Sequence, residues 1–159
     1  MLSQTVEYAL RAVVHLADES PDARTTQQIS EATQVPKPYL SKVLQSLCRS
    51  GIVRSQAGIG GGMSLARSPD DLTILEVVNA VDPIVRIETC PLGLKTHGRR
   101  LCPLHRRLDN ALAMLQESFG TTTLSQLMNQ PDSPHPLCDI PAEVLEKNDE
   151  PPRPRGRSR

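Results

Sequence analysis

The chain has 159 residues with 18 acidic and 18 basic side chains, and an aromatic content of 2% leaves the core to Leu, Val, Ile and Ala. This length predicts one domain with an appended helix and tail, and the formal net charge of +0 excludes a nonspecific nucleic-acid coat but not a specific binder with basic patches. The sequence has no stretch apolar enough to span a membrane and no signal-peptide pattern, so we expect a cytoplasmic protein with no membrane partner.

A first helix is predicted from Gln4 to Ala17, with an inward side of apolar residues at helical spacing. Glu7, Arg11 and His15 recur at every fourth position and share another face. From spacing alone, the simplest interpretation of Glu7 is an exposed ion pair with Arg11, worth about 0.3 kcal/mol. The inward side consists of Val6, Leu10, Val13 and Ala17.

The stretch from Thr25 to Ala66 predicts a winged helix-turn-helix. Thr25 and Gln28 have the spacing of a capping box, so a helix begins there and ends before a proline-marked turn. A second helix is predicted from about Pro38 to Ser50. Two short strands around a glycine-rich tip then form a β-hairpin, the wing.

The outward face of the second helix carries groups that read base edges and bind phosphates, and the helix width suits the major groove. A merely solvated face is the alternative for an isolated helix, but the helix before it and the hairpin after it favour DNA binding. No Gly-Lys-Ser/Thr follows the wing glycines, which argues against a nucleotide loop. The predicted DNA contacts are Thr26, Lys37, Pro38, Tyr39, Ser41, Lys42, Gln45, Arg54, Gly60 and Gly61.

A second capping box, formed by Thr73 and Glu76, predicts a helix that ends near Val81 and closes the winged-helix core. We therefore assign residues 1–82 to a DNA-binding domain. Residues 83–102 form a basic loop with several prolines and glycines, and loops of this length are usually functional or disordered.

A helix is predicted from Pro103 to Phe119, stopping at Gly120. Its apolar residues recur in steps of three and four, as in a coiled-coil seam, and a seam outside the winged-helix core predicts a homodimer. Packing against its own domain is the alternative. The seam is Leu101, Leu104, Leu108, Ala111 and Leu115.

The chain after this helix divides into two parts. A short helical turn is expected at 123–128, within a dimerisation region at 103–130. Residues 131–159 are rich in Pro and Arg and predict a disordered tail. The fold class is thus mainly α with a small β-hairpin.

Cys90 and Cys102 are separated by eleven residues, and His105 lies three positions after Cys102, on the same helix face. The helix dipole favours a thiolate at this first turn. In a reducing compartment such residues are metal ligands or buried thiols rather than disulfides. A thiolate and an imidazole suit zinc or an iron–sulfur cluster, although zinc sites usually show tighter cysteine pairs. Cys48 is interpreted as a small buried hydrophobe.

Three motifs together resemble the Rrf-type family, the IscR/NsrR-like bacterial winged-helix regulators, over about residues 1–130: Tyr8-Ala9-Leu10-Arg11, Pro38-Tyr39-Leu40 and Gly58-Ile59-Gly60-Gly61-Gly62. The resemblance implies a dimeric repressor on a near-palindromic double-stranded DNA operator, with an iron–sulfur cluster in many members. Members often carry an Arg before the first wing glycine for the minor groove. This chain has Ala57 there, so Arg54 or Arg67 would have to substitute.

The resemblance also implies a set of cluster ligands. Cluster-binding members tend to have three cysteines with five residues between successive ones. Cys90 and Cys102 match the outer two, whereas the middle position is Thr96. His105 matches a histidine of some relatives, and Glu7 matches an acid that ligates the cluster from the other subunit.

A [2Fe-2S] cluster would then have four protein ligands, namely Cys90, Cys102, His105 and Glu7. His97 or Cys138 could replace one of them. The threonine at the middle position leaves open a cluster-free regulator with a zinc site or a thiol redox pair.

We expect a homodimeric regulator whose DNA affinity responds to the site at Cys90 and Cys102. The loop joins this site to the dimer helix. A change of ligation could therefore shift the two reading heads, meaning the DNA-binding domains of the two subunits, relative to each other. A winged helix used for protein interaction is the alternative, against which the basic and amide residues of the second helix argue. An enzyme is excluded because the sequence shows no nucleophile–base pair.

Overall fold

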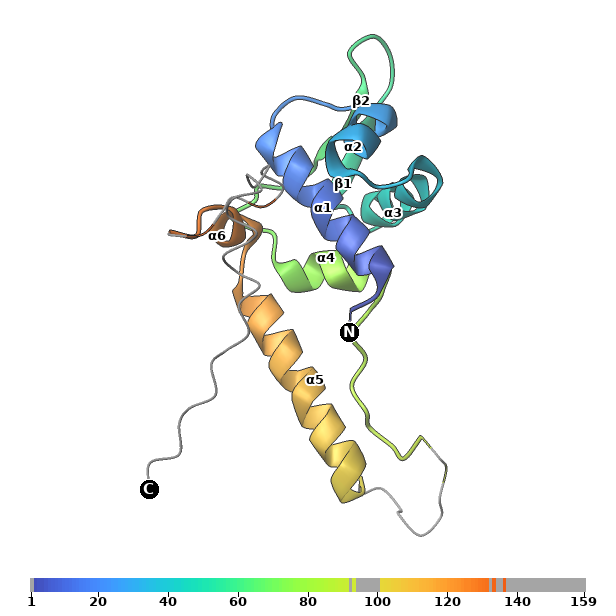
Figure 1. Cartoon of the computed structure of the whole chain (residues 1–159), viewed down its shortest axis with the longest axis vertical. Coiled ribbons are helices and arrows are strands. Elements are labelled where there is room, and N and C mark those ends of the chain that lie inside the picture. The colour runs from blue at the N-terminus through green and yellow to red at the C-terminus, as the bar shows by residue number, and fades with distance from the viewer. Residues whose placement is uncertain (1, 92, 94–100, 132, 134–135, 137–159) are drawn as a thin grey trace, which may run out of the picture.

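The computed structural model describes residues 2–91, 93, 101–131, 133 and 136, and it is mainly helical with a two-stranded hairpin, as predicted (Figure 1). None of the helices among these residues combines the length and apolarity needed to cross a bilayer. The elements in chain order are α1 (Gln4–Asp18), α2 (Thr26–Thr33), α3 (Lys37–Arg49), β1 (Val53–Gln56), β2 (Gly62–Leu65), α4 (Ile74–Val81), α5 (Pro103–Thr121) and α6 (Leu124–Met128).

The core lies where α1 packs against α2, α3, α4 and the hairpin. Of the predicted inward side of α1, Val6 and Val13 are buried, whereas Leu10 and Ala17 are half-buried at the edge of the core. On α3 the buried residues recur at helical spacing and fix which face of the helix is left outside. These residues are Leu40, Val43, Leu44 and Leu47.

The helix-turn-helix begins at the predicted capping box. The amide of Gln28 donates to Thr25 Oγ1 at 3.2 Å, and Gln28 Oε1 accepts from the amide of Thr25 at 2.8 Å. The α2–α3 turn contains Gln34 in the left-handed conformation at φ 56°. The Ser30 hydroxyl donates to the Val35 carbonyl at 2.6 Å, and α3 then starts one residue earlier than predicted.

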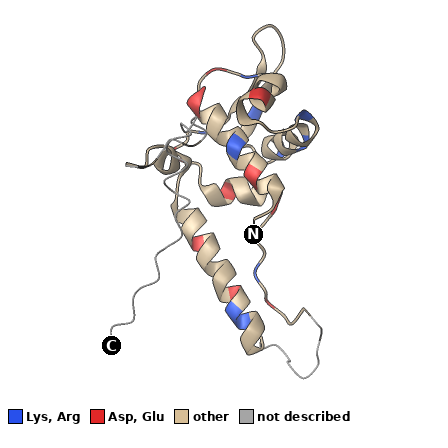
Figure 2. Cartoon of the chain, viewed as in Figure 1, with Lys and Arg blue, Asp and Glu red and all other residues tan. Residues whose placement is uncertain are grey.

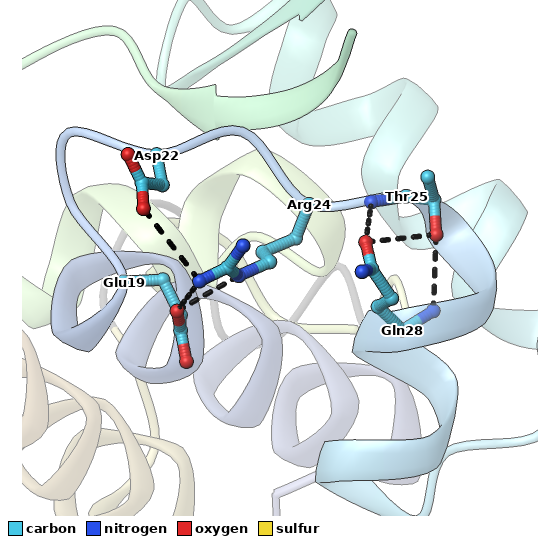
Figure 3. A network of polar contacts seen from close by, with 5 residues as sticks. All are labelled: Glu19, Asp22, Arg24, Thr25 and Gln28. Atoms are coloured by element: carbon cyan, nitrogen blue, oxygen red, sulfur yellow. Dashed lines mark hydrogen bonds and ion pairs between the residues drawn. The ribbon is translucent and has the colours of Figure 1, made fainter. Parts of the chain in front are cut away.

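The connection between α1 and α2 contacts the hairpin through the backbone of Arg24, and its side chains form a polar network (Figure 3). The guanidinium of Arg24 pairs with Glu19 and lies 3.7 Å from Asp22, and its hydrogen bond lowers the pKa of Glu19. The backbone of Arg24 exchanges two hydrogen bonds with Met63 of β2, at 2.7 and 2.8 Å. A Cβ at Gly62 would lie 2.6 Å from the Arg24 carbonyl, so this close approach requires glycine.

The end of α5 differs from the prediction. The helix continues through Gly120 to Thr121 instead of stopping at the glycine. A Cβ at Gly120 would contact Leu75 Cδ2 at 3.4 Å, so the glycine marks the place where α5 passes α4. The predicted short helix follows as α6, and its Leu124 returns to the core.

The greater part of α5 projects away from the winged-helix body (Figure 1). None of its residues is buried. The segment that follows α4 leaves the body in the same direction as an open trace beside this helix. These two segments form an arm, defined as residues 83–91 together with Cys102 and α5, and the arm carries the predicted sensor cysteines.

Candidate nucleic-acid interface and sensor site

The outward face of α3 presents five of the ten predicted DNA contacts to solvent. The opposite side of the helix is buried in the core, so this side is exposed. The exposed residues are Lys37, Pro38, Tyr39, Lys42 and Gln45. Figure 2 shows the basic residues of α3 on the outside of the body. This surface offers cationic and amide donors without competing ion pairs in the described structure.

Three predicted contacts on or beside α3 are partly engaged within the chain. Thr26, at the start of α2, is half-buried. The hydroxyl of Ser41 donates to the Lys37 carbonyl at 2.9 Å, which leaves its lone pairs as acceptors. The Tyr39 ring lies 6.2 Å from that of Tyr8 at a tilt of 53°, so α1 supports the start of the recognition helix.

In the wing, the fold itself explains one of the two predicted glycine contacts. Gly60 is exposed, with φ 76°. The amide of Gly61 donates to the Gly58 carbonyl at 3.0 Å, and a Cβ on Gly61 would lie 2.4 Å from the Gln56 carbonyl. Gly61 is therefore required by the turn itself. Ile59, between Gly58 and Gly60, is fully exposed at 111%.

The two arginines that could replace a wing cation lie elsewhere. Arg54 on β1 is exposed, and its Nε donates to Ser64 Oγ at 3.1 Å across the hairpin. Arg67 binds Glu76 of α4 at 2.6 Å, and this bond lowers the pKa of Glu76. The tip from Ala57 to Gly62 therefore has no cation of its own (Figure 2).

At the sensor site, the first turn of α5 brings a thiol and an imidazole together. Cys102 is the N-cap of α5, and its Sγ lies 3.2 Å from Nδ1 of His105. Both residues are half-buried. The predicted sharing of one helix face is therefore realised as direct contact between two potential ligand atoms.

The remaining predicted ligands are not gathered around this pair within one chain. Glu7 binds Arg11 at 3.0 Å, as the simpler interpretation expected, on a helix of the body remote from the start of α5 (Figure 1). Cys90 is half-buried and free of a disulfide, like Cys102. In the described ranges, no three His, Cys, Asp or Glu side chains are grouped to hold one metal ion. Thr96, His97 and Cys138 lie outside the described residues.

Cys48 is half-buried on α3 and packs against the core. Burial raises the pKa of this thiol, which agrees with its interpretation as a small hydrophobe.

An ion pair that the sequence pattern did not predict joins the two parts of the arm, the segment of residues 83–91 and α5. The Arg86 guanidinium binds Asp109 of α5 through two bonds of 2.6 Å, and the Ile87 amide donates to Asp109 Oδ1 at 2.9 Å. The bond to Arg86 lowers the pKa of Asp109 to about 2. The only sequence signal was Asp109 itself, one turn after His105, because its partner lies 23 residues away.

The chain matches one family model over nearly all of its described length. The Rrf2 model, described as an iron-dependent transcriptional regulator, covers residues 2–130. A protein of Aquifex aeolicus (strain VF5) classed with the HTH-type transcriptional regulators is 30% identical over 132 residues, 81% of this chain and 92% of that protein. The HTH-type transcriptional regulator NsrR of Bacillus subtilis (strain 168) is 34% identical over 90 residues, 56% of this chain and 62% of NsrR.

Solved structures agree with this match at the level of the fold. CymR, the global cysteine regulator of B. subtilis, has a TM-score of 0.66 at 23% identity and covers 80% of this chain and 95% of CymR. IscR of T. potens has a TM-score of 0.65 at 20% identity and covers 79% of this chain and 83% of IscR. The relatives are regulators and not enzymes, as expected. The chain therefore belongs to the Rrf2 family and is a DNA-binding transcriptional regulator with a winged-helix fold.

Proposed function

We propose that the chain acts as a homodimeric repressor whose affinity for a near-palindromic operator is set by a metal or cluster site on the arm. The observation that carries the dimer is α5, a helix of 19 residues with none buried. Its seam residues Leu104, Leu108 and Leu115 are 65%, 47% and 39% exposed. Such an apolar surface on a projecting helix is typical of an interface.

A groove at the base of α5 supports a second copy as the partner. It has a volume of about 480 Å³ and opens between the start of α1, the segment after α4, and α5. Its apolar lining is Leu2, Val6, Pro83, Ile84, Val85, Leu112 and Leu115. A two-fold dimer built on this face would present two α3 helices, and hence predicts half-sites about one helical turn apart or a multiple of it.

For the sensor, the pair of Cys102 and His105 supports metal binding because its two ligand atoms already meet. Cys90 would supply a second thiolate and Glu7 of the partner subunit a carboxylate, which gives four ligands for a [2Fe-2S] cluster. Such a cluster would supply reversible one-electron redox chemistry and ligand exchange. The protein would contribute the sulfur of Cys102 at the start of α5 and the imidazole of His105 one turn later.

A cluster-free thiol sensor is the second candidate, and the contact of 3.2 Å between Cys102 Sγ and His105 Nδ1 favours it. An imidazole that takes the thiol proton leaves a reactive thiolate. Cys102 and Cys90 would then form a disulfide, with two electrons and two protons passing to an external thiol oxidant. Thr96 in the position of a middle cysteine agrees with this alternative.

The test is the colour and composition of protein made and purified without oxygen, from cells with an intact cluster supply. The cluster proposal expects iron and acid-labile sulfide, which Cys90→Ala and Cys102→Ala should each abolish. Glu7→Ala should alter the absorption spectrum without unfolding the protein, because an exposed pair with Arg11 contributes little. Colourless, iron-free protein would contradict the cluster and direct the next measurement to zinc and thiol oxidation.

A further inference from the structure

Residues 83–90 of the arm form a connecting strand of chain, outside the β-sheet, that carries Cys90 and is fastened to α5 at two levels. The Gln116 side chain donates to the Ile84 carbonyl at 2.8 Å. Nearer the start of the helix, the Asp109 carboxylate accepts hydrogen bonds from the Arg86 guanidinium and from the Ile87 amide. The side chain of Asp109 is only 14% exposed, so this carboxylate lies between the strand and the helix.

The two levels define a register between strand and helix. From Gln116 to Asp109 the helix rises about 10 Å over seven residues, at about 1.5 Å per residue. The three steps from Ile84 to Ile87 have to span this interval, which a nearly extended backbone does at about 3.3 Å per residue. One further step of three strand residues reaches Cys90, and one further step of seven helix residues reaches Cys102. Continued at the same rates, this register would bring the two cysteines to the same level along α5, where the chain turns and the Cys90 carbonyl accepts a hydrogen bond from the Gly93 amide at 2.9 Å.

We propose that Asp109 is a positioning residue for the sensor site, which anchors Arg86 and Ile87 to α5 and so holds Cys90 level with Cys102 and His105. This inference rests on the proposed function only in taking Cys90, Cys102 and His105 as the sensor site. His105 and Asp109 are one turn apart on the same helix face. The anchored strand therefore runs over the face that carries the thiol–imidazole pair.

The same anchor gives the site a mechanical connection to the reading head. The strand begins directly after α4, whose residues Val77 and Val78 are buried in the winged-helix core. Asn79 of α4 accepts a hydrogen bond from the Ile84 amide at 3.0 Å. A change at Cys90 is thus transmitted through a short strand that is fixed to α5 and to α4.

The test measures the proximity of the two thiols without any metal. In full-length protein, Cys48→Ala and Cys138→Ser leave Cys90 and Cys102 as the remaining cysteines. The reduced, chelator-treated protein is oxidised with diamide, and the intrachain disulfide is followed as a monomer band on non-reducing gels and by peptide mass. Arg86→Ala and Asp109→Ala should each slow its formation about tenfold, because an unanchored loop lowers the effective concentration of the thiols.

Two variants separate positioning from general destabilisation. Asp109→Asn keeps an acceptor for the Ile87 amide but loses the charge, and should give an intermediate rate. Arg67→Ala removes another exposed arginine–carboxylate pair, far along the chain from the cysteines, and should leave the rate unchanged. Urea midpoints of all variants should coincide within error, since the anchor lies outside the buried core.

Equal rates in the parent and both anchor variants would overturn the inference, and so would a parent that forms no intrachain disulfide. Iron in anaerobic protein together with equal rates would leave the cluster proposal standing while removing the anchor. Iron-free protein together with slowed anchor variants would contradict the cluster proposal and leave the anchor standing.

Discussion

The winged-helix body and the arm differ in what holds them together: buried apolar side chains in the body and polar contacts in the arm. Every buried apolar residue of the described chain lies between Val6 and Val78, except Leu124 of α6. The arm has none in α5, and it is held to itself mainly by polar contacts around Asp109. The body is therefore stabilised by its own hydrophobic core, whereas α5 leaves its apolar seam exposed to solvent. The difference separates a DNA-binding unit with its own core from the region to which we assign the proposed assembly and sensing.

The sharpest way to break this comparison is to remove the same side chain from each region. Leu44→Ala empties a site that is 1% exposed in the core, and we expect the free energy of unfolding to fall by about 2–5 kcal/mol. Leu104→Ala in the arm, where the residue is 65% exposed, should cost far less at concentrations where the protein is monomeric. Urea denaturation of both variants measures the difference, and equal losses would show that the arm shares the core.

The next largest effect concerns assembly. Leu108→Glu places a carboxylate in the apolar seam of α5, and burying that charge in a homodimer would be strongly unfavourable. Sedimentation should show monomers, with circular dichroism of the body unchanged. Exposed Glu117→Gln on the same helix serves as the control and should remain dimeric. A dimeric Leu108→Glu variant would mean that another surface pairs the chains.

On the reading head, the effects are expected to be smaller and of two kinds. Gln45→Ala should relax base preference at one operator position, at a cost of about 1–3 kcal/mol. Lys42→Ala should weaken binding to all sequences if the ammonium contacts phosphate, and reduce the salt slope by about 1. Binding to duplexes selected from a random pool, measured at several salt concentrations, distinguishes the two. Unchanged affinity and specificity in the double variant would remove α3 from the interface.

The smallest effect is a pH dependence confined to the arm. The folded-state pKa of Asp109 is about 2, below the ordinary value of 3.8, so the ionised carboxylate favours the anchored strand. That contribution is fully present above the ordinary value and is lost as the pH falls through about 2. Arg86 proton signals should therefore move in this acidic range in the wild type. In Asp109→Asn no such transition should occur, and a transition at neutral pH in the wild type would contradict the assignment.

Local signals in the sequence predicted most of the body. Capping boxes at Thr25 and Thr73 and the apolar spacing of α3 depend on residues three or four positions apart, which pattern reasoning detects well. Gly120 predicts a helix end because glycine commonly terminates helices. The helix continues through it instead, and the glycine allows α5 to pass close to Leu75 of α4. The backbone bridge of Arg24 likewise depends on a strand far along the chain.

The sensor site could be predicted only in part for the same reason. Cys102 and His105 are close in sequence, and their contact follows from helix geometry. The anchor of Arg86 on Asp109 spans 23 residues and leaves no periodic pattern. The proposed ligand Glu7 would have to join the site from a second chain, so neither the sequence nor the fold of one chain determines the complete set.

The uncharged wing tip has a consequence for how the regulator should behave as ionic strength changes. Each phosphate neutralised by a lysine or arginine releases counterions and adds about 0.9 to the salt slope of DNA binding. A tip that presents Ile59 in place of a cation releases none, so the slope depends on the basic residues elsewhere in the body. We therefore expect operator occupancy to decline less steeply with added salt than if Ala57 were an arginine, and the protein to spend less time on unrelated DNA.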